Sequence, residues 1–186
     1  TKSIDAYQAY LAGVRSLNAF DLPAAARQFR RAIQLDSTFA LGHYKLAVSL
    51  LWASSADTLG RVHAERALQL SAGLPLRERT LIKAFAYYPR REYGAMCETA
   101  APLVRADSSD VEAVGAMADC LFHDVSMLPA PGDTSKRVFR GDWNASLRLF
   151  RRTLELDPTY HLAYQHFIDV YLRDTQHFLE LALLAW

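Results

Sequence analysis

The chain has 186 residues, and its 21 Lys and Arg nearly balance its 20 Asp and Glu, which leaves a formal net charge of +1. This balance excludes the basic surface typical of nucleic-acid binders, and a hydrophobic fraction of 51% excludes a disordered chain. No apolar run reaches the ~20 residues that span a bilayer, and two cysteines are too few for a disulfide scaffold or a structural zinc site. We therefore expect a folded, soluble and mainly helical protein.

Two segments of the chain, about 121 residues apart, align without a gap. Residues 21–39 read DLPAAARQFRRAIQLDSTF, and residues 142–160 read DWNASLRLFRRTLELDPTY. A weaker third copy runs over residues 92–108. Each copy starts with an acidic residue or a short polar turn and continues with apolar residues at helical spacing. It ends at or near an aspartate, and a second helical pattern follows. The sequence therefore predicts helix pairs that recur every ~34 residues.

In chain order, these pairs predict one domain over residues 1–186. The fourth repeat is enlarged by an insertion at 124–140, and the fifth is incomplete. The predicted repeats lie near residues 6–39, 41–74, 77–110, 111–160 and 161–186.

Small and aromatic residues at fixed places in these pairs resemble the tetratricopeptide repeat (TPR) family, whose pattern combines Leu-Gly, Ala, an aromatic residue, Ala and Pro. The first copy fills these places with Gly13, Ala25, Phe29 and Ala32, and the fourth fills them with Trp143, Ser146, Phe150, Thr153 and Pro158. The resemblance implies an all-α, right-handed α-solenoid of about four and a half repeats. It further implies a non-enzymatic scaffold that binds another protein in its concave groove.

In this family the first helix of each repeat lines the groove. Carrying the family positions over gives a set of candidate partner-binding residues: Tyr7, Tyr10, Lys45, Ser49, Trp52, Glu112, Asp119, Phe122, His123, Gln165, Asp169 and Arg173. Trp52 is the strongest candidate anchor, although packing at the end of its own helix is an equal alternative. The basic clamp by which TPR co-chaperones hold a terminal carboxylate is missing, because Tyr10, Val14, Lys45 and Ser49 occupy its places.

The sequence contains no pattern that carries chemistry. It has no phosphate-binding loop, no nucleophile elbow and no His-Glu-x-x-His motif. His161 and His166 are five residues apart, which places them about 140° apart around a helix. We therefore expect no catalytic residue, no metal site and no cofactor.

The insertion at 124–140 contains Pro129, Pro131 and Gly132, which forbid a regular helix there. Its apolar and basic side chains favour an ordered loop that contributes to recognition, with Phe139 or Leu128 packed against the repeats or a partner. The alternative is a mobile insertion without a role. The loop residues that we assign to recognition are Met127, Leu128, Arg137 and Phe139.

The two cysteines fall on neighbouring antiparallel helices. Cys97 lies near the start of the predicted helix before residue 107, and Cys120 lies near the end of the next helix. We expect the two residues to be close, either as thiols in the core or as a disulfide, which would indicate an oxidising compartment.

The order of features also resembles the repeat regions of bacterial signalling proteins such as Ser/Thr kinases. This leaves two alternatives to the interaction scaffold: a sensor domain that binds a peptide or small ligand for an attached enzyme, and a structural subunit of a larger, possibly membrane-bound, assembly. The apolar end FLELALLAW, residues 178–186, favours docking onto another surface and a chain that is part of a longer polypeptide. The compartment is not assigned by the sequence; we expect a bacterial periplasmic rather than a cytoplasmic domain.

Overall fold

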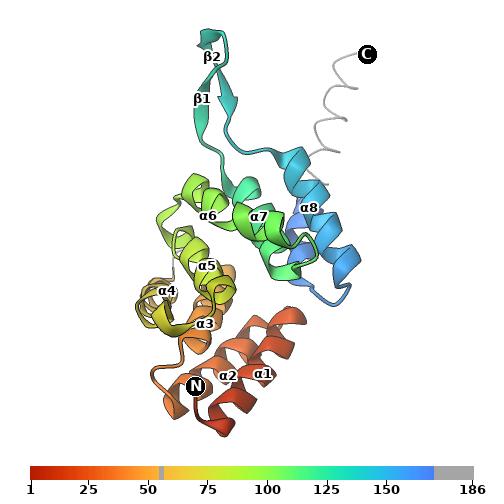
Figure 1. Ribbon diagram of the computed structural model, residues 1–186. Helices are drawn as coiled ribbons and strands as arrows, with labels where there is room; N and C mark the ends of the chain where they lie inside the picture. Colours follow the sequence, from red (N-terminus) through yellow and green to blue (C-terminus); the bar gives the residue numbers. More distant parts are fainter. Residues whose placement is uncertain (55–56, 170–186) are drawn as a thin grey trace.

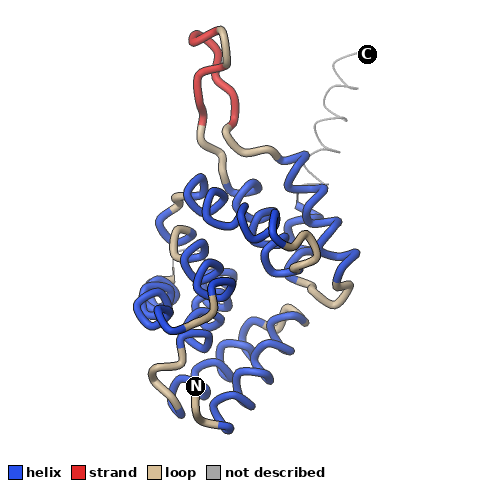
Figure 2. Tube along the Cα trace, viewed as in Figure 1, coloured by secondary structure: helices blue, strands red, loops and turns tan. Residues whose placement is uncertain are grey.

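The computed structural model describes residues 1–54 and 57–169. Over this part, the chain is a zigzag of antiparallel helix pairs interrupted by one β-hairpin (Figures 1 and 2). The elements are α1 (Ile4–Asn18), α2 (Leu22–Leu35), α3 (Ala40–Ala53), α4 (Thr58–Leu70), η1 (Ser71–Gly73), α5 (Leu76–Phe85), η2 (Tyr88–Arg90), α6 (Tyr93–Ala106), α7 (Val111–His123), β1 (Met127–Ala130), β2 (Asp133–Phe139) and α8 (Trp143–Leu156). Residues 162–169 are also helical.

Short polar side chains start most of these helices, as the sequence predicts. Asp21 and Asp142, the first residues of the two aligned segments, cap α2 and α8 by accepting the backbone N–H three residues further on. These side chains satisfy amide groups that have no partner inside the helix. The same contact starts three further helices, at Ser3, Asp57 and Asp110.

An identical turn ends the second helix of three repeats. Asp36, Asp107 and Asp157 each follow the last helical residue, and one carboxylate oxygen of each accepts both the backbone N–H and the hydroxyl of the residue two positions later. The acceptor–donor distances are 2.6–2.9 Å in all three turns. The repeated Asp-x-Ser/Thr sequence thus has one physical role, which is to reverse the chain between repeats.

Small residues on one helix and aromatic residues on the next bring the helices of a pair together. A Cβ atom on Gly13 of α1 would lie 2.6 Å from the ring of Phe29 in α2, so any other residue here would require that ring to shift. Phe29 and its counterpart Phe150 in α8 are both buried. The fold is therefore an all-α repeat array held by the residues that carry the sequence resemblance.

The array curves until its later repeats meet its first. The backbone N–H of His161 donates to the carbonyl of Asn18 at the end of α1, at 2.9 Å. Leu162 shares a buried apolar cluster with Leu17 and Leu46. Figure 1 shows the loop after α8 close to the end of α1. The inner faces of distant helices therefore touch, and this contact decides which of the predicted groove residues stay accessible.

The insertion forms an antiparallel hairpin in which Met127 pairs with Phe139 and Leu128 with Val138. Its turn is Pro131–Gly132, and Gly132 has a φ of 80°, which a Pro–Gly turn of type II requires. The sequence predicted the excursion but not its strands. Leu128 is 42% exposed, so it is not buried against the repeats, and the expected packing of Phe139 or Leu128 against the repeats or a partner stays a prediction. The side chains of Arg137 and Phe139 lie outside the described part.

The base of the hairpin is tied to α7. Arg140 donates to both carboxylate oxygens of the buried Asp124, at 2.5 and 3.0 Å. The backbone N–H of Arg140 also donates to the carbonyl of Ser126, at 2.7 Å. The two ends of the insertion are thus adjacent, and the hairpin projects from the array at a fixed root (Figure 2).

Cys97 of α6 and Cys120 of α7 form a disulfide, with Cα atoms 5.5 Å apart. The expected proximity is confirmed, and of the two alternatives the structure contains the bonded form. No helix in the described residues is long and apolar enough to cross a membrane. Arg173 and the apolar segment 178–186 lie outside the described residues.

Candidate partner-binding groove

An open groove of about 610 Å³ lies among the predicted groove positions. It lies between the inner side of α1 and the ends of α5, α6 and α7, and its floor includes residues after α8. We call it the inner groove; the residues that line it are Tyr10, Val14, Asn18, Lys45, Arg77, Leu103, Ala106, Asp107, Asp110, Val111, Glu112, Asp157 and Tyr160.

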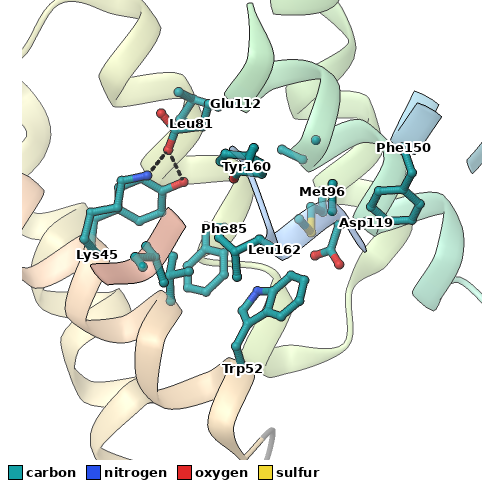
Figure 3. A pocket seen from close by; sticks show the side chains of 16 residues that line it. Lys45, Trp52, Leu81, Phe85, Met96, Glu112, Asp119, Phe150, Tyr160 and Leu162 are labelled. Carbon is teal, nitrogen blue, oxygen red and sulfur yellow. Dashed lines mark hydrogen bonds and ion pairs between the residues drawn. The ribbon is translucent and has the colours of Figure 1, made fainter. Parts of the chain in front are cut away.

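An ion network crosses one wall of the inner groove. Lys45 of α3 forms an ion pair with Glu112 of α7, and Tyr44 Oη donates to the same carboxylate at 3.0 Å (dashed in Figure 3). Arg77 of α5 donates to both carboxylate oxygens of Asp110, at 2.6 and 2.7 Å. Two-pronged contacts of this kind fix orientation as well as charge.

Burial and charge act in opposite directions on the pKa of these groups. Burial by itself would raise the pKa of Glu112, but Lys45, Arg77 and the Tyr44 hydroxyl together hold it below its ordinary value. Burial likewise opposes the charged form of Lys45, whose pKa Glu112 nevertheless raises. Both side chains are therefore charged at neutral pH.

The helix pairs, their shared Asp-turns and their small–aromatic contacts together define the architecture. The chain is an all-α array of repeated antiparallel helix pairs, similar in layout to TPR proteins. The sequence matches no family model and no curated protein.

Three solved structures show a similar helical fold at low identity. They are YrrB, a TPR protein with an unusual peptide-binding site (16% identity, 92% of this chain and 78% of that chain, TM-score 0.43), a MamA RS-1 ArsTM double mutant (13%, 100% and 97%, 0.43), and MamA 41-end from Desulfovibrio magneticus RS-1 (13%, 100% and 97%, 0.42). These similarities say nothing about the partner of the present chain.

The helical array separates the predicted groove residues into accessible and buried groups. Tyr10, Lys45 and Glu112 line the inner groove, and Tyr7 is exposed beside it, with its ring stacked on Tyr10 at 6.1 Å between centroids. Gln165 is also exposed. Their role in binding stays a prediction.

Three other predicted residues are buried, namely Ser49, Asp119 and Phe122. Phe122 packs with Phe150 of α8 and Ala163 in a buried cluster, and Ser49 Oγ donates to the carbonyl of Lys45 one turn earlier in α3. Trp52 packs edge-on against Phe20, at 6.1 Å between ring centroids, and lies 4.6 Å from the ring of His166. Trp52 is therefore packed against other rings, which agrees with the alternative that it is a packing residue rather than an exposed anchor.

A small cavity of about 50 Å³ lies behind the ion network (Figure 3). Trp52, Phe85 and Met96 form apolar walls, and the carboxylate of Asp119 lies on one side. The cavity separates the inner groove from a cluster in which Asp119, His123 and His166 meet.

Sequence reasoning missed several of these residues. Arg77 has no counterpart in the family pattern. In the sequence, Asp107 and Asp157 can be recognised only as turn-forming residues and not as residues of the groove. The cluster was missed because the histidines were compared only with each other. The i, i+4 spacing of Asp119 and His123 was a detectable signal, but the contribution of His166 depends on how two repeats stack.

Proposed function

We propose that this chain is a non-enzymatic interaction module that binds an extended, basic peptide segment of another protein in the inner groove. The observation that carries the proposal is the excess of carboxylates in that groove. Its volume of about 610 Å³ falls within the ~300–1,000 Å³ of typical ligand sites.

Four carboxylates line the inner groove, but only two cations do. Lys45 and Arg77 pair with Glu112 and Asp110, as described above. Asp107 and Asp157 also line the groove, and no ion pair within the described residues involves either of them. Because their carboxylates keep a net negative charge at the groove, they favour Lys or Arg side chains in the bound segment.

Aromatic and apolar surface adjoins these charges. Tyr10 presents one side to the groove and stacks on the exposed Tyr7. Tyrosine pairs of this kind provide large, rigid contact area and are enriched at interaction hot spots. We therefore expect an apolar residue of the partner to lie next to its basic residues.

The hairpin, which follows the opposite end of α7, offers a second apolar surface away from the inner groove. Met127, Leu128 and Val138 are each 42–45% exposed, and Leu128 and Val138 pair across the two strands. Exposed apolar side chains on an ordered projection are typical of a contact surface. The hairpin is proposed as a second contact, made with the body of the partner rather than with the bound segment.

The sensor alternative would use the same groove. The small cavity of about 50 Å³ is well below the size of typical ligand sites, so a small ligand would also have to bind in the inner groove. A peptide-sensing domain and a structural subunit would both bind their partner in the inner groove. These two alternatives differ from the proposed interaction module only in what is attached to the chain. The Cys97–Cys120 disulfide supports an oxidising, extracytoplasmic compartment.

Selection from a library of displayed random peptides tests the proposal. Enriched peptides would be synthesised with a fluorescent label, and their affinity for the wild type and for variants would be measured by anisotropy. The double variant Asp107→Asn/Asp157→Asn and the single variant Tyr10→Ala are each expected to weaken binding about tenfold, which corresponds to ~1.4 kcal/mol.

Glu155→Gln provides the matched control, because it removes a carboxylate from an exposed position of α8 outside the inner groove. It is expected to leave the affinity unchanged. Enriched peptides without Lys or Arg, or peptides that bind the groove variants as tightly as the wild type, would show that the inner groove is not the binding site.

A further inference from the structure

Three potential metal ligands from two helices converge at one point next to the small cavity. Asp119 and His123 lie one turn apart on α7, and His166 lies on the helix over residues 162–169. Asp119 Oδ1 is 3.4 Å from His123 Nε2 and 3.2 Å from His166 Nε2, and the two Nε2 atoms are 3.2 Å apart. The three atoms therefore form a nearly equilateral triangle.

From this geometry we propose that Asp119, His123 and His166 bind a divalent transition-metal ion, with Zn²⁺ as the best fit. A Zn²⁺ ion holds imidazole nitrogens and carboxylate oxygens at ~2.0–2.2 Å, so tetrahedral ligand atoms are about 3.3–3.6 Å apart. The observed separations of 3.2–3.4 Å agree with this spacing. Two imidazoles and one carboxylate are a common ligand set for such ions.

The hydrogen bonding of Asp119 points to a ligand independently of the distances. Asp119 is only 6% exposed, and its Oδ1 atom accepts no hydrogen bond of good geometry from the residues that the structure describes; its polar neighbours are the two Nε2 atoms, at 3.2 and 3.4 Å. A buried carboxylate oxygen without a donor is costly. The unsatisfied atom is the same one that faces both Nε2 atoms, so a cation between the three groups would remove this cost.

The surroundings support the proposed ligands. Asp169 Oδ2 lies 3.4 Å from Nδ1 of His166, on the opposite side of the ring from Nε2. A carboxylate in this position keeps the proton on Nδ1 and leaves Nε2 free to coordinate. The rings of Phe122 and Trp52 flank His166, with centroids 4.3 and 4.6 Å from its own. These walls restrict water and limit the movement of the imidazole.

The cavity leaves room for a fourth ligand. Figure 3 shows the Asp119 carboxylate facing the side of the cavity where Trp52 lies. A volume of about 50 Å³ exceeds the ~30 Å³ that one water molecule occupies in the liquid. The bound ion would link α7 to the next repeat, next to the disulfide at Cys120. This role does not depend on the proposed peptide binding.

Titration of the metal-free protein with zinc chloride, followed by calorimetry, tests the proposal. The wild type is expected to bind one Zn²⁺ per chain, and the binding should raise its melting temperature with increasing zinc concentration. Asp119→Asn, which preserves shape, and His166→Gln are each expected to weaken the site about 100-fold or more. Asp169→Asn, which removes only the outer carboxylate, should weaken it about tenfold. Cobalt(II) absorption provides a second readout, because its visible spectrum reports tetrahedral coordination directly.

Another histidine pair provides the control. His43 Nδ1 and His63 Nδ1 are 3.0 Å apart, and the residues that the structure describes bring no third ligand to them. His63→Gln should leave zinc affinity unchanged. Absence of zinc binding by the wild type, equal binding by Asp119→Asn, or loss of binding in His63→Gln alone would each overturn the proposal. Should His166→Gln fail to fold, Asp119→Asn and Asp169→Asn still decide the outcome.

Discussion

At the scale of single residues, the stability of the helix pairs depends on positions where a neighbouring ring leaves no room for a side chain. Gly13 faces the ring of Phe29, which is fully buried. The sequence resemblance marks both residues, and the structure shows why they occur together. Gly73, by contrast, has no atom within 4 Å of the place where a Cβ would stand.

Gly13→Ala is expected to destabilise the protein by about 1–3 kcal/mol, because the added methyl group overpacks the α1–α2 contact. This cost exceeds the ~1 kcal/mol by which alanine is the better helix former. Urea unfolding followed by circular dichroism measures the difference. Gly73→Ala is the matched control and should be neutral; equal effects of the two substitutions would mean that Phe29 can move aside.

At the scale of elements, the hairpin is an addition to the repeat array rather than part of its core. Its root is held by Arg140 and Asp124, and its described side chains beyond the root are mostly exposed. The array itself is stabilised by contacts between successive helices and by the disulfide between α6 and α7. Stability and recognition are therefore assigned to different elements.

Replacing Met127–Phe139 by two glycines should leave the melting temperature nearly unchanged, because the carbonyl of Ser126 already accepts a hydrogen bond from the N–H of Arg140. The same change should weaken binding of a full partner protein but not of an isolated peptide in the inner groove. Thermal unfolding and anisotropy measure the two effects. A large loss of stability, or unchanged binding of the partner, would contradict the proposed role of the hairpin.

At the scale of the whole molecule, the Lys45–Glu112 pair joins α3 of the second predicted repeat to α7 of the fourth at one wall of the inner groove. Tyr44, Tyr10, Tyr160, Arg77, Asp110 and Glu78 are the other titratable groups around it. Because the pKa of Glu112 is lower in the folded protein, its contribution to stability is present above the ordinary glutamate pKa of ~4.3. That contribution is lost as the pH falls through the lower, folded value.

Glu112→Gln should therefore lower the free energy of unfolding at pH 7 by about 2–3 kcal/mol. This is less than the ~3–5 kcal/mol for breaking a fully buried pair, since both side chains keep some exposure. The difference between wild type and variant should shrink below about pH 4, where the wild-type carboxyl also becomes neutral. Urea unfolding over a pH series measures it; a difference that does not change with pH would show that the charge of Glu112 is not responsible.

The sequence by itself determined the helix pairs, their Asp caps, the position of the insertion and the proximity of Cys97 to Cys120. These features depend on residues close together in the chain or on neighbouring helices, where periodicity and spacing suffice. Only the tertiary structure decided the rest. The packing of the repeats buries Ser49 and Phe122, leaves Tyr10 at an open groove, and brings His166 to Asp119 and His123. Small rotations between successive repeats add up along a solenoid, so contacts between distant repeats depend on the packing of every pair between them.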